Sequence, residues 1–356
     1  MKSKSFYPQA AFLLLAIIFW GMLSGCGKSK GVPLLSVATE VVQLPPGMSE
    51  AGAETLMTLE QLDDFPLYTM QYLAAYDQDL VLEATDMIPN LPTATWACSL
   101  FAAMGDPEEM FFGRNFDWEF SPALLLFTYP PDGYAAVSMV DIAYLGYGDG
   151  EAFGLTELPL NELTDLLIAP YLPFDGMNEA GLAVGMAAVP PGGLTTDPEK
   201  ETVGSLLAIR KILDKAATVN EAIVILKSYN IDFLEGPPLH YLIADKSGRS
   251  ALVEFSKGEV KVIPNADPWQ MTTNFLISET WSDPETMCWR YAVISERMTE
   301  SEGQLTSQES MGLLEGVAQE GTQWSVVYGF STGQIQLVMD RDYNNVYTFS
   351  LGDSRD

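Results

Sequence analysis

The sequence predicts an α+β fold in which two antiparallel β-sheets are stacked face to face and flanked by helices. Two observations predict this class. Strand-like segments come in consecutive blocks joined by turns that contain Gly and Pro, which is typical of antiparallel sheets. Helical segments come in pairs between these blocks, whereas a parallel sheet would alternate single helices with strands. The chain has 356 residues, 47% of them apolar, which is enough for one large domain or two small ones.

The N-terminus resembles a bacterial lipoprotein signal peptide. Lys2 and Lys4 form a basic start, residues 11–22 are apolar, and small residues precede Cys26. The apolar stretch is too short for a comfortable transmembrane span. The sequence therefore predicts a signal peptide over 1–25 and a lipid on Cys26 that anchors the chain to the cell envelope. An uncleaved anchor or an ordinary secretory signal is the alternative, and each of these also takes the chain out of the cytoplasm.

Residues 26–97 are expected to form a tether and a prosegment. The stretch from 27 to about 55 contains Gly, Pro, Ser and Glu without a sustained period, which is typical of a linker. Residues 58–84 place apolar side chains at helical spacing, with an interruption at Pro66. This part is expected to be helical.

Strand-like segments follow in three blocks. Within the first two blocks, turns or loops that contain Gly separate the strands. The expected strands are 124–128, 135–143, 181–189, 240–245, 250–255, 260–263, 323–330, 334–339 and 346–351.

Four helices lie between these blocks. Two of them begin at a capping box, in which a Thr is followed three residues later by a Glu. The expected helices are 203–216, one from the Thr218–Glu221 box to about 229, 289–298, and one from the Thr306–Glu309 box to about 319.

Charge and motifs exclude several classes of function. There are 48 acidic residues against 18 basic ones, a formal charge of −30, and binding to a phosphate backbone depends on Lys and Arg. Nucleic acid is therefore not expected as a partner. The sequence contains no GxGxxG, P-loop, CxxC or HExxH motif, and its one histidine, His240, cannot build a His-rich metal site. No cofactor and no metal are expected.

Cys98 is the candidate nucleophile. It lies in the apolar run 96–101, and Arg114 and Asp117 follow 16 and 19 residues later, after a turn at 105–107. This spacing suits a β-hairpin whose second strand brings a cation and a carboxylate beside the sulfur. A neighbouring positive charge favours the thiolate, which is the reactive form of a thiol.

A cysteine nucleophile also needs a base. His240 is far away in sequence and is most simply a structural residue. If the peptide bond before Cys98 is cut, the new α-amine has a reference pKa of about 7.7–8.0 and can accept the proton of its own side chain. The alternative for Cys98 is a disulfide with Cys288, because an exported chain is located in an oxidising compartment, where disulfides form. Without that disulfide, Cys288 is expected to be a small buried apolar residue.

Four separated motifs together carry a family resemblance, in the order and approximate spacing that the family has. They are Cys98 with 113–115 and Asp117, then 175–182, then Thr273-Asn274, and then Arg290. With these motifs the chain from Cys98 onward resembles the N-terminal-nucleophile (Ntn) hydrolases of the choloylglycine hydrolase and acid ceramidase group, which are linear amide C–N hydrolases.

The resemblance implies a four-layer αββα sandwich over 98–356. It implies that Cys98 cuts the Ala97–Cys98 bond and then hydrolyses a small-molecule N-acyl amide such as a bile-acid conjugate, an N-acyl amino acid or a fatty-acid amide. The polar residues around the nucleophile receive the following roles by resemblance: Arg114 lies against the sulfur, Asp117 orients the α-amine, Asn178 and Asn274 stabilise the oxyanion, and Arg290 completes the polar set.

Several alternatives stay open at this point. The prosegment is either removed or kept as a small subunit, and Asn178 could be an ordinary turn residue. Ser99 stands where many relatives carry threonine, although it keeps the hydroxyl. An envelope solute-binding lipoprotein and an inactive protein with the same fold are the competing functions. The oligomeric state is not determined by the sequence.

Overall fold

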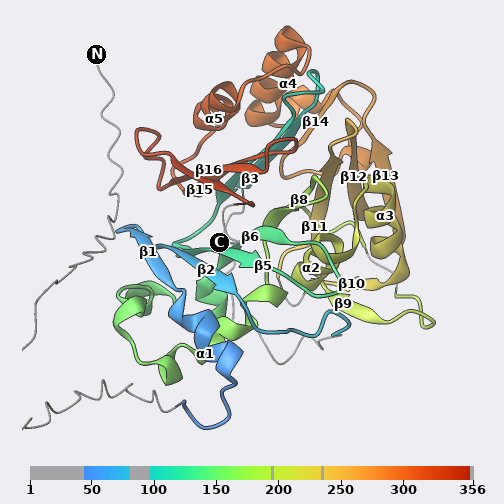
Figure 1. Ribbon diagram of the computed structural model, residues 1–356. Helices are drawn as coiled ribbons and strands as arrows, with labels where there is room; N and C mark the ends of the chain where they lie inside the picture. The colour runs from blue at the N-terminus through green and yellow to red at the C-terminus, as the bar shows by residue number, and fades with distance from the viewer. Residues whose placement is uncertain (1–43, 81–96, 194–195, 234–235, 353–356) are drawn as a thin grey trace, which may run out of the picture. The chain divides into compact units, whose positions relative to one another are not determined.

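Two β-sheets carry most of the chain in the computed structural model, which describes residues 44–80, 97–193, 196–233 and 236–352 (Figure 1). The predicted signal peptide, Cys26 and the first part of the predicted tether lie outside these residues. The larger sheet has nine strands in this order: β1 (Glu60–Asp63), β2 (Leu67–Tyr72), β5 (Ala123–Thr128), β6 (Ala136–Asp141), β7 (Asp175–Asn178), β8 (Leu182–Ala188), β11 (Leu239–Asp245), β12 (Arg249–Ser256) and β13 (Glu259–Pro264).

The second sheet has six strands in this order: β14 (Trp269–Thr272), β3 (Ala97–Ala103), β4 (Phe111–Asp117), β15 (Thr322–Gly329), β16 (Gln334–Met339) and β17 (Tyr347–Ser350). In these two sheets the strand pairs are antiparallel, apart from β2, which runs parallel to β5. A small parallel pair is formed by β9 (Thr202–Gly204) and β10 (Asn230–Asp232).

The helices are α1 (Glu50–Met57), α2 (Ser205–Lys215), α3 (Val219–Ser228), α4 (Trp289–Ser301) and α5 (Ser307–Gly316). Short 3-10 helices lie at Ile142–Leu145, Asp149–Ala152, Leu155–Glu157, Leu160–Glu162, Thr164–Tyr171, Ile277–Glu279 and Pro284–Thr286. No helix of the described ranges is long and apolar enough to cross a membrane.

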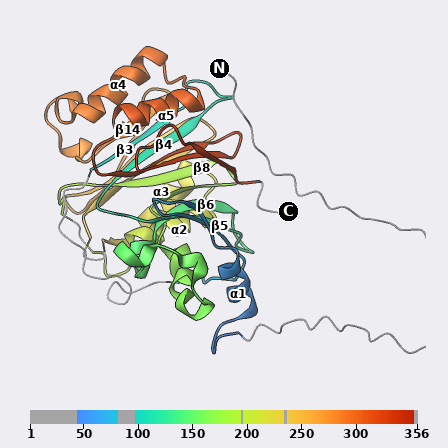
Figure 2. The same cartoon turned by 90° about the vertical axis from the view of Figure 1, so that its left-hand side faces the viewer.

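The layers run helix, sheet, sheet, helix, as Figure 2 shows. Helices α4 and α5 pack on the six-stranded sheet, where they contact β3, β14, β4 and β15. Helices α2 and α3 pack on the nine-stranded sheet, where they contact β7, β8, β11 and β12. The two sheets meet where β3 lies against β8. The predicted four-layer α+β architecture is therefore confirmed.

The close contact between the sheets explains a glycine and the apolar strands. A Cβ added to Gly185 of β8 would lie 2.7 Å from a terminal methyl group of Leu100 of β3, so a larger residue there would require the Leu100 side chain to move. Successive side chains of a strand point to opposite faces. In β3, Leu100 therefore joins the core between the sheets, while Phe101 joins the core under α4 and α5. Because both faces are buried, these strands read as continuous apolar runs rather than as alternating ones.

The helix predicted over residues 58–84 is wrong for the described residues up to 80, because strands β1 and β2 form there, and residues 81–84 lie outside the described ranges. Tyr68, Met70 and Tyr72 are buried while the residues between them are only partly buried, so the true period is two. Leu73, which the helical spacing required in the core, is 49% exposed. The predicted tether also ends too late, because α1 begins at residue 50 with Ser49 as its N-cap.

The two predicted capping boxes are confirmed, each with both of its hydrogen bonds.

The motif 175–182 is not only a turn. Its first four residues form β7, and the chain then turns into β8 through Gly181, whose φ of 80° suits glycine.

Candidate active site

The predicted hairpin is confirmed and carries the candidate nucleophile. Strands β3 and β4 pair antiparallel, with Cys98 opposite Phe116 and Leu100 opposite Arg114. Directly opposite residues point to the same face of a sheet. Cys98, Arg114 and Phe116 therefore face the nine-stranded sheet together, whereas Ser99 and Asp117 face the helices α4 and α5.

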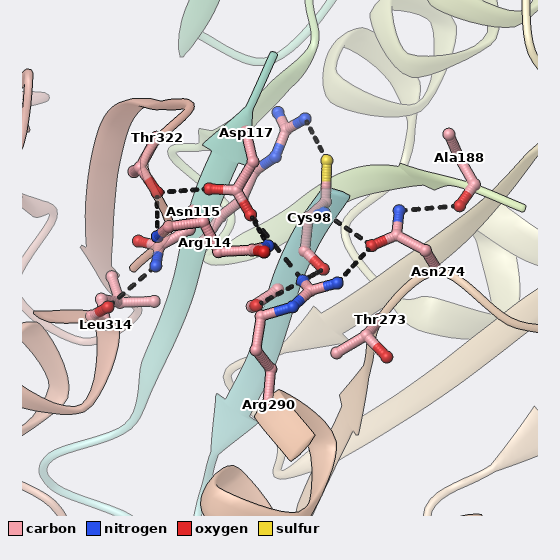
Figure 3. A network of polar contacts seen from close by, with 12 residues as sticks. Cys98, Arg114, Asn115, Asp117, Ala188, Thr273, Asn274, Arg290, Leu314 and Thr322 are labelled. Carbon is pink, nitrogen blue, oxygen red and sulfur yellow. Dashed lines mark hydrogen bonds and ion pairs between the residues drawn. The ribbon is translucent and has the colours of Figure 1, made fainter. Parts of the chain in front are cut away.

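The Cys98 thiol is buried, with only 4% of the residue exposed. Arg114 Nη2 lies 3.9 Å from the sulfur (Figure 3). Burial raises the pKa of the thiol, the Arg114 guanidinium lowers it in part, and the Asp117 charge raises it again. The pKa of the Cys98 thiol lies above its ordinary value in the uncut chain, so the sulfur is held there mainly as the neutral thiol.

Arg114 is fully buried between the two sheets. Its Nη1 forms an ion pair with Asp175 and donates to the carbonyl of Phe174 at 3.0 Å. Its Nε has no hydrogen-bond partner among the described residues. Asp175 is a buried partner of Arg114; the sequence placed it in the 175–182 motif but assigned it no role. The available signal was a carboxylate at the start of a motif that is otherwise apolar or turn-forming.

Asn274 holds the backbone nitrogen of Cys98. This nitrogen donates to Asn274 Oδ1 at 2.7 Å, and Arg290 Nη2 donates to the same oxygen at 2.9 Å. The amide group of Asn274 is thereby oriented, because its Nδ2 then faces and donates to the carbonyl of Ala188 at 2.8 Å (Figure 3). The atom that would become the α-amine after a cut before Cys98 is thus already part of a polar network.

Arg290 is a buried member of this network and not a solvated surface residue. It is 6% exposed, and its Nη1 donates to the carbonyl of Cys98 and, at 2.9 Å, to Ser99 Oγ. The same nitrogen lies 3.7 Å from Asp117 Oδ2. The Ser99 hydroxyl, which replaces the threonine of many relatives, is therefore used as an acceptor for Arg290.

Asp117 lies beside Cys98 but does not hold its nitrogen in this structure. Its carboxylate accepts hydrogen bonds from the Thr322 hydroxyl and, at 3.1 Å, from Gln319 Nε2. Burial raises the pKa of the Asp117 carboxyl, while the hydrogen bond from Thr322 and the charge of Arg290 lower it in part. Asp117 contacts the Cys98 region through Arg290, and the Cys98 nitrogen bonds to Asn274.

Asn178 is not part of the site that the structure brings together. Its Nδ2 donates to the carbonyls of Leu213 and Ala216 at 2.9 and 2.7 Å, and its Oδ1 accepts from Leu182 N at 3.1 Å. Both amide hydrogens thus satisfy carbonyls at the C-terminal end of α2, which otherwise lack partners. The expected amide donor to an oxyanion is committed to a helix end, and the turn-residue alternative comes closer to its actual place.

An apolar pocket opens beside the sulfur. It contains about 540 Å³ of space, its open mouth included. Cys98 and Arg114 supply its charged and reactive groups. The apolar lining comes from β4, β8, β11, α2 and the loops between them: Phe116, Trp118, Tyr144, Phe174, Met186, Leu206, Phe233 and Leu239. These lining residues come from segments that are far apart in the sequence.

Both Cys98 and Cys288 are free thiols in the described chain, so the disulfide alternative is not formed here. Cys288 is the N-cap of α4 and is half-buried, not an apolar core residue. Burial alone would raise its pKa. The nearby Thr273 hydroxyl and the N–H groups at the start of α4, together with the Arg290 charge, hold the pKa of Cys288 below its ordinary value.

His240 lies beneath the segment that carries Asn274 and does not line the pocket. Its Nε2 is 3.1 Å from the Thr272 hydroxyl. Nearby, Glu254 accepts hydrogen bonds from the N–H groups of Ile277 and Ser278 at 2.7 and 2.9 Å. The structural role expected for His240 agrees with this position.

The fold and the site together define a class. Two antiparallel sheets between helical layers, with a candidate cysteine nucleophile at the start of an inner strand, are the arrangement of Ntn hydrolases. Residues 98–275, half of the chain, match the model of the linear amide C-N hydrolases, choloylglycine hydrolase family. The chain belongs to this family of hydrolases, which act on C–N bonds of linear amides.

Solved structures of one hydrolase agree on the fold. A mutant of conjugated bile acid hydrolase from Clostridium perfringens has a TM-score of 0.53 and 18% identity, over 72% of this chain and 93% of that chain. A second variant of this hydrolase has a TM-score of 0.52 and 15% identity, over 72% and 94%. A penicillin V acylase from Agrobacterium tumefaciens has a TM-score of 0.48 and 16% identity, over 72% and 92%.

Proposed function

We propose that the protein is a cysteine amidase that cuts its own chain before Cys98 and then hydrolyses an N-acyl amide with an apolar acyl group. The observation that carries the proposal is the double environment of Cys98. Its nitrogen lies in the polar network of Asn274 and Arg290, while its sulfur faces the apolar pocket beside Arg114. The family match also begins at this residue.

Self-cleavage would proceed through the sulfur. Cys98 Sγ attacks the carbonyl carbon of Ala97, the Ala97–Cys98 C–N bond breaks, and the nitrogen leaves as the α-amine. Water then hydrolyses the thioester to give the carboxylate of Ala97 and the free thiol of Cys98. The new amine stays within reach of Asn274, which holds the same nitrogen before the cut.

In turnover the α-amine of Cys98 accepts the thiol proton, and the sulfur attacks the substrate carbonyl. The amine returns this proton to the leaving nitrogen, and water releases the acyl group from the thioester. Arg114 Nη2 lies beside the sulfur and lines the pocket, so it is placed to donate to the oxyanion. Asn274 uses one amide hydrogen on Ala188, and the second remains for the same purpose.

The pocket favours an uncharged, apolar acyl group. Its walls are largely aromatic and aliphatic, and the one cation among its described lining residues, Arg114, is already paired with Asp175. A second charge inside would lose its hydration without a partner. Bile-acid conjugates, N-acyl amino acids and fatty-acid amides all present their apolar part on the acyl side, and these are the substrate types we propose.

A matched set of substrates tests this function. Amides with one amine and an apolar acyl chain are compared with amides whose chain ends in a carboxylate. We expect hydrolysis of the apolar series, and acid-quenched mass spectrometry should find the acyl group on the peptide that begins at Cys98. If the purified, cut protein hydrolyses none of these amides, the alternative of an inactive protein with this fold is supported. Binding of the amides by an uncut chain would favour a solute-binding lipoprotein.

We further propose that Cys26 carries a lipid and anchors the enzyme to the outside of the cell. The basis is the order of a basic start, a short apolar stretch and small residues before this cysteine. Labelling with a radioactive fatty acid should mark the wild-type chain and not the Cys26→Ala variant. Equal labelling of both would refute the anchor.

A further inference from the structure

A buried carboxylate connects the two sheets directly behind the site. Asp175 begins β7 in the nine-stranded sheet, whereas Arg114 and Tyr328 lie on the paired strands β4 and β15 of the six-stranded sheet. All three residues are fully buried. One oxygen of Asp175 pairs with Arg114 Nη1, and the other accepts a hydrogen bond from the Tyr328 hydroxyl.

These contacts determine which edge of the Arg114 guanidinium faces the sulfur. Nη1 is engaged by Asp175 and by the carbonyl of Phe174, so Nη2 is the nitrogen that points to Cys98 Sγ. The guanidinium carbon lies 4.9 Å from the centre of the Phe116 ring and 5.9 Å from that of Trp324. The rings and the carboxylate together leave the group one orientation.

We propose that Asp175 is a positioning residue of the amidase, which aims Arg114 at the Cys98 sulfur and reduces the positive charge that the sulfur experiences. The Tyr328 hydroxyl holds Asp175 in this position. The inference rests on the proposed role of Cys98 as nucleophile, but its test needs no substrate.

The other charged groups around Cys98 are separated from Asp175 by the strands themselves. Asp117 is opposite Ala97 in the sheet and therefore lies on the face that looks toward the helices. Arg290 reaches Cys98 from α4 on that same face. The charge that Asp175 balances is thus that of Arg114, and a change at Asp175 acts on the sulfur through Arg114.

Asp175→Asn removes the balancing charge and keeps the size of the side chain. The uncompensated guanidinium then stabilises the thiolate more strongly in a buried, weakly screened place. We expect the pKa of the Cys98 thiol to fall by about one unit or more. Tyr328→Phe acts in the opposite direction. Asp175 loses a hydrogen bond, so its negative charge is less stabilised by Tyr328 and compensates the positive charge of Arg114 more strongly. For this variant we expect the pKa of the thiol to rise.

The measurement is the rate of Cys98 alkylation by iodoacetamide between pH 5 and 10, followed on the Cys98 peptide by mass spectrometry. Asp141→Asn is the matched control, because Asp141 is also buried in the nine-stranded sheet but does not line the pocket. An unchanged thiol pKa in a folded Asp175→Asn protein would overturn the proposal. If that variant does not fold, an unchanged value in Tyr328→Phe overturns it equally. Since the titration needs no turnover, a failed amidase assay would not affect it.

Discussion

At the scale of single residues, the two asparagines of the family motifs have different tasks in this chain. Asn274 holds the backbone nitrogen of Cys98, the proposed nucleophile, and is itself oriented by Arg290. Asn178 holds the end of α2 through two backbone carbonyls. The residue type is the same, but only the tertiary contacts distinguish a residue of the site from one that stabilises a helix.

Asn274→Ala should lower kcat/KM by about 10² to 10³, because a donor and the support of the Cys98 amine are lost together. Asn178→Ala should leave kcat/KM of the folded enzyme within a few-fold of wild type. It should instead lower the free energy of unfolding by about 1–3 kcal/mol, since two buried carbonyls lose their donor. Amide hydrolysis and urea unfolding of both variants check this contrast. A catalytic loss in Asn178→Ala as large as that in Asn274→Ala would contradict it.

A second residue-scale prediction concerns pH and stability. Burial raises the pKa of Asp141 to about 7, while an unfolded Asp titrates near about 3.9. Between these two pKa values the folded chain binds a proton on Asp141 more tightly than the unfolded chain does. Asp141 therefore stabilises the fold below about pH 4, and this contribution is lost as the pH rises to about 7. The loss is of the order of 4 kcal/mol.

Asp141→Asn should abolish this part of the pH dependence, because an amide side chain does not titrate. The amide oxygen can still accept the hydrogen bond from Ala143 N, so the local structure is kept. Urea unfolding at pH 5 and pH 7.5 measures it. The decrease in unfolding free energy between the two values should be smaller in the variant. An equal decrease in both proteins would show that Asp141 is not the group responsible.

At the scale of elements, residues 44–80, which precede Cys98 in the chain, are built into the domain. Strand β2 lies between β1 and β5, and its Tyr68 and Met70 belong to the core. The Tyr76 hydroxyl donates to the buried Asp214 of α2 at 2.9 Å. Removal of this segment would uncover one edge of β5 and a buried ion pair between Arg210 and Asp214.

We therefore expect the segment before Cys98 to stay bound after the cut as a small subunit. Gel filtration of the cut protein without denaturant should elute both pieces together, and urea should separate them. Elution of the larger piece alone as a folded, active enzyme would contradict this expectation.

The elements also show what sequence patterns can and cannot predict. The two capping boxes and the β3–β4 hairpin could be predicted because their signals are local, within a few or about twenty residues. The pairing of β2 with β5 could not be predicted from the spacing of the apolar residues. Its apolar residues fit a helical period as well as a strand period over a short run, and only its partner strand decides between them.

At the scale of the whole molecule, the site depends on contacts that are distant in sequence. Asn274 and Arg290 reach Cys98 across 176 and 192 residues. Their motifs could be identified from the sequence, and so could the αββα class. The motif around Asn178 specifies the strand and the turn but not the direction of the side chain, which in this structure bonds to the end of α2. The pocket walls come from strands, a helix and loops that are far apart in the sequence, and no local pattern encodes how these elements pack together.

The most direct test of the central claim is the N-terminus of the large fragment. Intact mass and N-terminal sequencing of purified protein should find a fragment that begins at Cys98, and the Cys98→Ala variant should remain uncut. A wild-type chain that hydrolyses an N-acyl amide substrate while its Ala97–Cys98 bond stays intact would contradict the account. The α-amine proposed as the base would then not exist.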